Sequence, residues 1–358
     1  MTERRLGVPR RSGSLQGFSL VELLVAMAIG LVLVLAAAAA LMVSSRGYTL
    51  VDAASQLRHN TTFAVGLVSR VAMQAGFVDI PFASTPATAW ELAMVEPAVF
   101  GFNNATVTQT AGAALGTIRS TNTPVDTLYV KPWVAGSAGA GSDVLVLRYQ
   151  PVGAGTERIR SDGSMVDCSG SAPDTASQSR NDTAINVFFV AADVGGEPAL
   201  FCYTLDNLPN SQRMQFENRM ALVRGVEGFQ VLYGVQARAP VVANAALTSS
   251  EDGVPYAYLR ADQLVVGGDA SSAATKKNWR LVRSLRIGFV LRSEAQRQPT
   301  PGPRLLYPLG LARASAQAAP GSAFASAADP GTVFAVPNDG RLRAAESFTV
   351  HLRNGQPD

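Results

Sequence analysis

The sequence predicts an α+β chain, in which a long N-terminal helix precedes an elaborated β-rich C-terminal region. Three observations predict it. The apolar run from Phe18 to Val43 is long enough for a helix that crosses a membrane. Small and apolar residues continue at helical spacing to Ala75, as in a helix packed on an antiparallel sheet. Beyond residue 78, short Val- and Leu-rich runs alternate with Gly- and Ser-rich turns, as in β-sheets.

Composition and charge limit the class of protein. The chain has 358 residues and is 47% hydrophobic, which is enough to bury a sizeable core. Its net charge of +3 arises in residues 1–17, which hold four arginines and one glutamate. A basic leader before an apolar run predicts that the N-terminus is cytoplasmic and that the C-terminal region lies across the membrane. No later Lys/Arg cluster predicts a nucleic-acid partner.

Glu22 is the single charged residue between Phe18 and Val43. Placing a carboxylate inside a membrane costs on the order of 3 kcal/mol of insertion free energy. We therefore expect Glu22 to have a function that accounts for its position. A secretory signal peptide cut within Ala36–Ala40 would give it none, and its apolar region would be unusually long. A plain signal anchor also leaves Glu22 unexplained.

The stretch Gly17-Phe18-Ser19-Leu20-Val21-Glu22 resembles the N-terminal signature of type IV pilins and pseudopilins. The resemblance implies that a prepilin peptidase cuts between Gly17 and Phe18, on the cytoplasmic side of the apolar run. It also implies that Phe18 is then N-methylated and that Glu22 is the assembly acid. Residues 1–17 would be a cleaved leader, and residues 18–43 the transmembrane and assembly helix.

Simple electrostatics agrees with these roles. Cleavage frees an amine at Phe18, one helical turn before Glu22. In a bundle of parallel helices, Glu22 of one subunit can pair with the Phe18 amine of its neighbour, because a charge within a membrane tends to find such a partner. Losing one partner of a desolvated pair costs roughly 3–5 kcal/mol. We therefore expect Glu22 to drive docking and to set the axial stagger of the subunits.

Residues 44–77 are predicted to form the extramembrane half of the helix. Its apolar stripe should lie on a sheet rather than in a free coiled coil, because it has few large residues. Gly76 is the predicted stop. The stripe follows spacings of four and three and comprises Leu50, Ala54, Leu57, Thr61, Ala64, Val68, Val71 and Ala75.

Two regions resemble PilW-type minor pilins. Along the helix the matching residues are Phe63-Ala64, Leu67, Arg70 and Ala75-Gly76-Phe77, although Val71 replaces a charge that often follows the arginine. In the final third they are Val226-Glu227-Gly228, Trp279, Arg286-Ile287-Gly288-Phe289-Val290-Leu291-Arg292-Ser293 and Thr349–Asn354.

This resemblance implies a pilin-like fold and a structural protein, not an enzyme. The chain would join other minor and major pilins in a type IV pilus or its priming or tip complex, and would support twitching motility, adhesion or DNA uptake. It would reside in the inner membrane as a single-pass protein before assembly, and in the periplasm and extracellular pilus afterwards.

The β-rich domain should span residues 78–358, with loop insertions near 236–279 and 295–340. A hairpin turn is predicted at Asp193–Glu197, and a short helical piece near Tyr258–Val265. The predicted strands are Ala98–Phe102, Asp126–Val130, Asp143–Tyr149, Ile185–Val190, Ala199–Leu205, Met220–Val223, Val226–Val235, Ser284–Arg292 and a closing strand that includes Thr349–Asn354.

Cys168 and Cys202 are the two cysteines, and both should lie in an oxidising compartment, where a disulfide is expected. Two free thiols, or a metal pair without further ligands, are the alternatives. Asp162, Asp167 and Asp174 share a Gly/Ser-rich loop whose oxygens could bind calcium, but a solvated loop is the preferred interpretation. The sequence contains no HExxH, Gly-x-Ser-x-Gly, P-loop or dinucleotide motif. We therefore predict no metal and no cofactor.

Two alternative functions remain. A pseudopilin of a type II secretion system has the same N-terminus, although the large β region and the closing Thr349–Asn354 segment favour a pilus. A membrane-anchored extracytoplasmic enzyme or ligand-binding protein belongs to another class. It predicts that a Glu22→Ala substitution leaves function intact.

Overall fold

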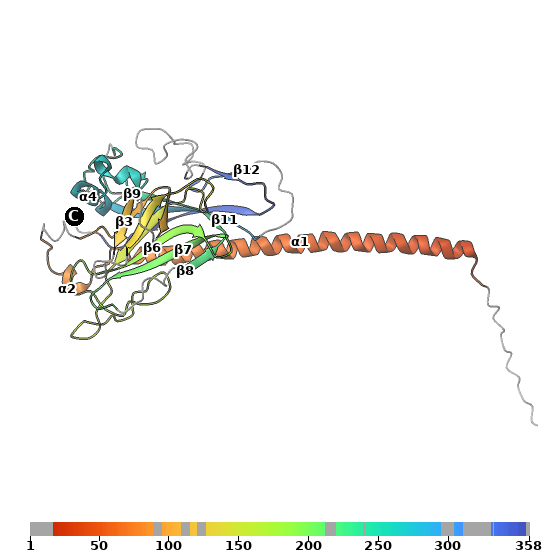
Figure 1. The fold of residues 1–358 in the computed structure, drawn as a ribbon, viewed down its shortest axis with the longest axis horizontal. Helices are drawn as coiled ribbons and strands as arrows, with labels where there is room; N and C mark the ends of the chain where they lie inside the picture. Colours follow the sequence, from red (N-terminus) through yellow and green to blue (C-terminus); the bar gives the residue numbers. More distant parts are fainter. Residues whose placement is uncertain are drawn as a thin grey trace, which may run out of the picture. The chain divides into compact units, whose positions relative to one another are not determined.

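The computed structural model describes residues 17–88, 95–108, 115–119, 127–211, 220–238, 241–294, 304–310, 331 and 333–355. The chain divides into two units, Met1–Asp52 and Ala53–Asp358, which are described separately. In the first unit, the described residues form a short segment without regular secondary structure and the first half of a helix. The second unit holds the second half of that helix, the sheets and the core (Figure 1).

Helix α1 spans Leu20–Gln74, a total of 55 residues. Gly76 follows with a φ of +77°, in the left-handed region where glycine commonly ends a helix. The predicted stop is therefore the residue at which the backbone leaves the helical conformation.

One sheet of the second unit has five antiparallel strands in the order β1-β5-β6-β7-β8 (Figure 1). Strands β6 and β7 form a hairpin. Its predicted turn is present, because the Asp193 amide donates to the Glu197 carbonyl over 2.8 Å. Every residue of β5 and of β7 is buried, which fits their runs of Val, Leu and aromatic residues. The strands are β1 Val99–Phe102, β5 Val144–Tyr149, β6 Thr183–Ala192, β7 Pro198–Asn207 and β8 Met220–Arg224.

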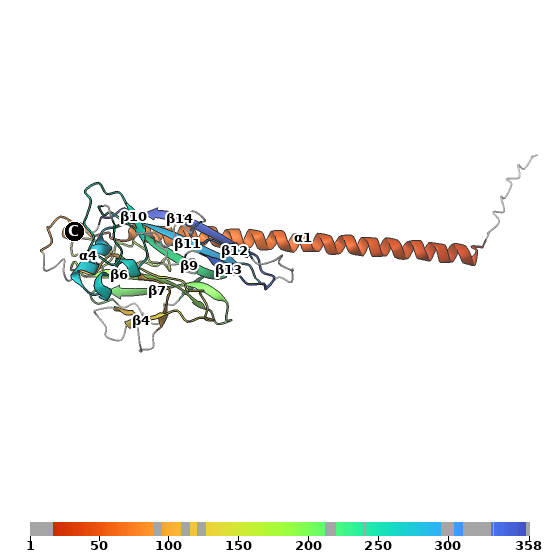
Figure 2. The same cartoon turned by 90° about the horizontal axis from the view of Figure 1, so that it is seen from above.

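A second sheet has four strands in the order β10-β9-β11-β14, and its members lie side by side in Figure 2. Strand β11 pairs antiparallel with both β9 and β14. Gly288 in β11 is required by close packing, since a Cβ there would lie 2.3 Å from the Pro308 carbonyl oxygen. Both faces of β11 are thus covered. The strands are β9 Val226–Val235, β10 Ala257–Leu259, β11 Val282–Arg292 and β14 Arg343–His351.

Smaller elements complete the second unit. A three-stranded sheet has the order β2-β4-β3, and strands β12 and β13 form a two-stranded sheet. The bounds are β2 Ala105–Thr108, β3 Gly116–Arg119, β4 Thr127–Pro132, β12 Arg304–Leu306, β13 Phe334–Val336, α2 Ile80–Ala83, α4 Ala273–Arg280, η1 Asp262–Leu264 and η2 Val266–Gly268.

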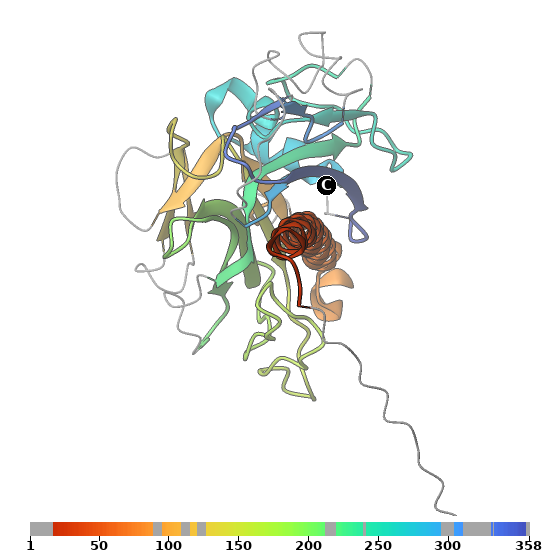
Figure 3. The same ribbon diagram turned by 90° about the vertical axis from the view of Figure 1, so that its right-hand side faces the viewer.

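The main core lies where the second half of α1 meets the two large sheets, which lie beside the helix in the end-on view of Figure 3. Ala64, Val68 and Val71 are fully buried, and they share one hydrophobic cluster with Phe188 of β6 and Phe289 of β11. A second cluster fills the space between the five-stranded and three-stranded sheets. The long helix and antiparallel sheets confirm the predicted α+β class.

Two local predictions were wrong in part. Ala54 is exposed and Ala53 is buried instead, because the stripe continues from Leu57 at a spacing of four toward the N-terminus. The helical piece predicted near Tyr258–Val265 is shorter than expected, because strand β10 pairs with β9 at Tyr258 and only the 3-10 turns η1 and η2 follow. Pairing with a strand distant in sequence overrode the local helical pattern.

One of the two predicted insertions is packed more closely than a surface loop would be. Residues 236–279 supply Leu259, Leu264 and Trp279 to the main core, so this segment is part of the packed structure rather than a surface loop. It also leads into α4, whose start is capped by the Ser272 side chain. Much of the predicted loop 295–340 lies outside the described residues, as does most of the leader 1–17.

Candidate functional site

The predicted processing and assembly residues lie at the start of α1. Gly17, Phe18 and Ser19 precede the helix, which begins at Leu20. The Phe18 side chain is 89% exposed. The Gly17–Phe18 peptide bond therefore lies in an open, non-helical segment, and Glu22 lies in the first helical turn after it.

Ser19 and Glu22 cap the helix reciprocally. The Ser19 amide donates to the Glu22 carboxylate over 3.0 Å, and the Glu22 amide donates to the Ser19 Oγ over 3.2 Å. These two bonds form a capping box, which satisfies amides that have no partner within the helix. Ser19 was not among the predicted site residues, although the Ser-x-x-Glu spacing is the signal that identifies it. The capping box fixes the helix start just after the predicted cleavage site.

The helix that follows is long and apolar enough to cross a membrane, judged by length and composition. Its large apolar side chains are exposed within this unit; Leu31 and Val32, for example, are 63% and 64% exposed. A chain that leaves such residues uncovered requires a lipid or protein environment around them.

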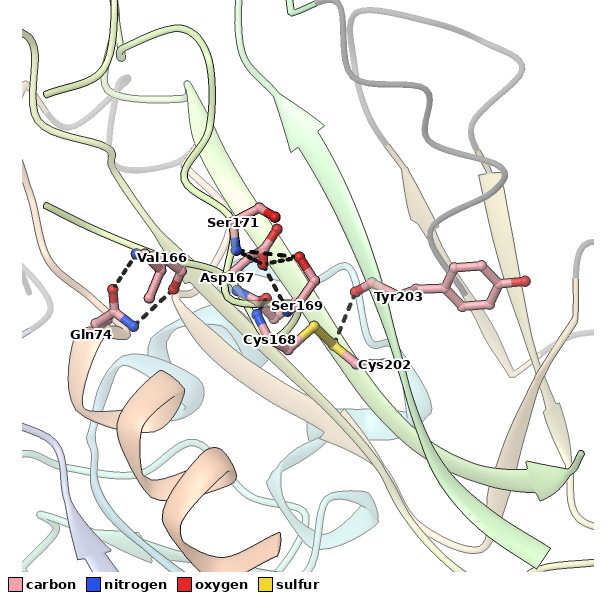
Figure 4. The surroundings of a disulfide bond; sticks show 9 residues. Gln74, Val166, Asp167, Cys168, Ser169, Ser171, Cys202 and Tyr203 are labelled. Carbon is pink, nitrogen blue, oxygen red and sulfur yellow. Dashed lines mark hydrogen bonds between the residues drawn. A yellow bond between two sulfur atoms is a disulfide. The ribbon is translucent and has the colours of Figure 1, made fainter. Parts of the chain in front are cut away.

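In the second unit, Cys168 and Cys202 form the predicted disulfide (Figure 4). Cys202 lies on β7 and is fully buried. Cys168 lies in the loop between β5 and β6, and its amide donates to the Asn186 side chain on β6 over 2.9 Å. The bond therefore attaches this long loop to the five-stranded sheet.

The same loop holds the C-terminal end of α1. The Gln74 side chain donates to the Val166 carbonyl over 3.0 Å and accepts from the Val166 amide over 3.1 Å (Figure 4). Val166 is two residues from Cys168. Two hydrogen bonds thus attach the end of the helix to the loop, and the disulfide attaches the loop to the sheet.

Asn354, which follows strand β14, also contacts the end of the helix. Its side-chain amide lies within hydrogen-bonding distance of the carbonyls of Met73, Gln74 and Ala75, at 3.2–3.4 Å. The last carbonyls of a helix have no partner within it, so a side-chain donor stabilises them. This contact assigns a structural role to the final residue of the Thr349–Asn354 segment.

A network of six charged side chains joins the two large sheets at one end. Arg292 at the end of β11 donates to Glu197 in the β6–β7 hairpin and to Glu227 on β9, over 2.6 and 2.8 Å. Three further groups complete the network, namely Asp339, Arg341 and Arg343. No local pattern predicts this network, because its members are spread over 147 positions of the chain.

The network alters the titration of its exposed acids. Hydrogen bonds from Arg341, and then from Arg292, lower the pKa of Glu197 to about 2. Bonds from Arg343 lower the pKa of Asp339 to about 2. Both carboxylates therefore remain charged well below neutral pH and hold the arginines in place.

The remaining candidate groups do not form a site. Asp162, Asp167 and Asp174 accept hydrogen bonds from serines, which they order into turns and loop contacts. In the part of the chain that the structure describes, no group of three or more His, Cys, Asp or Glu residues is arranged to hold a metal ion. His59 and His351 are both exposed.

Comparison with known families finds two matches. Residues 187–354 match the family described as type IV pilus-assembly protein W, PilW, and residues 15–38 match the prokaryotic N-terminal methylation motif. The second match includes Gly17, Phe18 and Glu22. The first includes the segments that resembled PilW in the final third, whereas the stretch from Phe63 to Phe77 lies outside both matches.

Among solved structures, a type IV-like pilin from Thermus thermophilus is similar at 13% identity and a TM-score of 0.37, over 84% of this chain and 99% of that one. No curated protein matches the chain significantly in sequence.

Proposed function

We propose that this chain, a pilin of the PilW type, is a structural minor pilin that docks through its N-terminal helix into a type IV pilus or into the complex that primes or caps it. The observation that carries the proposal is the methylation motif, with Glu22 as the lone acid of an otherwise apolar helix. In this role the protein supports pilus biogenesis and, through it, twitching motility, adhesion or DNA uptake.

The proposed mechanism begins at the membrane. Prepilin peptidase cleaves the open Gly17–Phe18 bond, and the new Phe18 amine is methylated. The apolar helix then keeps the subunit in the inner membrane, with the β-rich unit on the far side. Glu22 leaves its capping contact with Ser19 and pairs with the Phe18 amine of a neighbouring pilin, which brings the subunits into register.

Two measurements test the proposal. Mass spectrometry of the mature protein should find an N-methylated start at Phe18, whereas a start near Leu41 would indicate an ordinary signal peptide. A Glu22→Ala variant should still be cleaved but should fail to enter pili, because the amine of the neighbour is left without its partner. Normal numbers of surface pili containing that variant would overturn the assembly role.

A further experiment separates the pilus from a secretion pseudopilus. The full-length protein should co-purify from membranes with subunits of the pilus rather than with those of a type II secretion system. Co-purification with the secretion subunits alone would reassign the chain while keeping the helix mechanism.

A further inference from the structure

The second half of α1 leaves an unusual combination of residues on its outward face. Phe63 is 57% exposed, and Arg70 is exposed as well. Gly66 lies between them, and a Cβ there would meet no atom within 4 Å. Positions 63, 66 and 70 are three and four residues apart, so they share one face of the helix. The side chains of Phe63 and Arg70 take no part in the hydrophobic core.

A groove runs between this face and β8, the edge strand of the five-stranded sheet. Its volume is about 560 Å³. Met220 and Leu222 of β8 line it opposite Phe63 of α1, and Cys168 of the disulfide loop lines it too. Met220 is 40% exposed. A large aromatic and a methionine exposed around one hollow are typical of a surface that another molecule covers.

The charged residues around the groove indicate which kind of partner it binds. Arg70 forms no ion pair with any residue that the structure describes, whereas Arg224 at the end of β8 is paired with Asp193. Among the residues that the structure describes, no acidic side chain lines the groove. An apolar groove with one uncompensated guanidinium is complementary to an apolar segment that carries a carboxylate, because such a segment buries its side chains and pairs its charge together.

We infer that the groove between α1 and β8 docks an apolar, carboxylate-bearing segment of a different pilin, whose apolar side chains cover Phe63 and Met220 and whose carboxylate pairs with Arg70. The inference rests on the proposed function, which supplies other pilins as partners. It adds a contact outside the membrane half of the helix, so that docking uses a second charge pair in addition to the one at Glu22.

The first experiment captures the partner carboxylate. Arg70→Lys keeps the charge and adds an amine that a carbodiimide can join to a carboxylate in direct contact, with loss of water. Membranes containing the full-length variant are treated with the carbodiimide and analysed by mass spectrometry. We expect a link from position 70 to an Asp or Glu of another pilin. Arg58→Lys is the matched control, since Arg58 is exposed on the same helix but lies outside the groove.

The cross-linked product identifies which molecule occupies the groove. A link to a different pilin at position 70, absent at position 58, supports the inference. A link that joins two copies of this chain, or equal linking at both positions, overturns it. If the protein co-purifies with pilins and no link forms at position 70, the groove is not their docking site although the proposed function stands. If no pilin co-purifies at all, both proposals fail.

The second experiment measures the effect on assembly. Arg70→Glu should reduce the amount of co-purified pilin by about tenfold, because it replaces attraction with repulsion. Arg58→Glu should not. Cleavage at Gly17 and the thermal unfolding midpoint should be unchanged in both variants, which separates lost docking from lost folding. Reversing the sign of the partner's captured acid should restore co-purification with Arg70→Glu, and wild-type co-purification by Arg70→Glu alone would contradict the charge pair.

Discussion

The two halves of α1 are both α-helical, but they differ in how much of their apolar surface is buried against other parts of their unit. Before Asp52, large residues such as Leu31 and Val32 are more than 60% exposed within their unit. After Ala53, the inward face carries Ala64, Val68 and Val71, all fully buried against the sheets. The described residues therefore leave the apolar side chains of the first half exposed, whereas they bury the inward face of the second half.

The difference also lies in side-chain size. Leucine, alanine and valine are the commonest residues of the first half, and its leucines and valines present large apolar side chains around the helix, as a membrane-crossing helix does. Alanines and valines dominate the buried face of the second half, where small side chains let the strands approach the helix closely. The first half should thus govern location and assembly, and the second half the stability of the β-rich unit.

The largest expected effect comes from placing a charge on the buried face of the second half of α1. Val68→Asp places a carboxylate where the native side chain is fully buried, which should cost about 3–5 kcal/mol of unfolding free energy. Val32→Asp should leave the unfolding of the β-rich unit unchanged but should impair retention in the membrane. Urea unfolding and membrane fractionation of both variants measure this. Ser55→Asp, at an exposed position, is the control, and similar unfolding of all three variants would contradict the division.

Removing the disulfide should have the next largest effect and should act on the second unit alone. The double variant Cys168→Ser, Cys202→Ser should lose about 2–4 kcal/mol, because the bond limits the entropy of the unfolded chain. Thermal unfolding with and without a thiol reductant measures it. The reductant should destabilise the wild type and leave the double variant unaffected. A wild type that is indifferent to reductant would show that the loop is held by its other contacts.

Loss of the Asn354 contact at the end of α1 should have a smaller effect, again confined to the second half of the helix. Asn354→Ala removes the donor near the carbonyls of Met73 and Gln74 in the helix and of Ala75 just after it, and this should cost about 1–2 kcal/mol of unfolding free energy. Hydrogen exchange should accelerate in the last turn of α1 but not in its first half. Gly355→Ala is the matched control, because a Cβ there meets no atom within 4 Å. Unchanged exchange near Gln74 in Asn354→Ala would show that the Val166 contact suffices.

The smallest effect concerns pH. The pKa of Glu197 and that of Asp339 are lowered to about 2, from usual values of 4.5 and 3.8. A lowered pKa stabilises the folded state above the unfolded value, and this stabilisation is lost as pH falls from about 4.5 toward about 2. Both side chains are partly exposed, so each should contribute about 1 kcal/mol or less.

Unfolding midpoints between pH 5 and pH 3 test this contribution. Arg341→Gln removes the main donor to Glu197, so the midpoint of that variant should fall less with acid than the midpoint of the wild type. Parallel pH profiles for the two proteins would mean that the network does not couple folding to protonation.

The sequence predicted a large part of the strand pattern because the relevant signals are local. Strand β9 has the predicted bounds, and the turn after Ala192 follows from its Asp and Gly residues. The same local reasoning failed at Tyr258, where pairing with β9 decided the structure. It also overlooked α4, which has only eight residues and depends on contacts of Trp279 with the core.

By itself, the sequence determined the apolar helix, the lone acid and the processing motif, because each of these depends on neighbours within one or two helical turns. The disulfide also followed from a count of cysteines and the expected compartment. Tertiary structure alone decided the charged network from Glu197 to Arg343, the contact of Asn354 with α1, and the groove beside Phe63. Each of these joins residues far apart in the chain, and such contacts depend on how the sheets pack rather than on any local pattern.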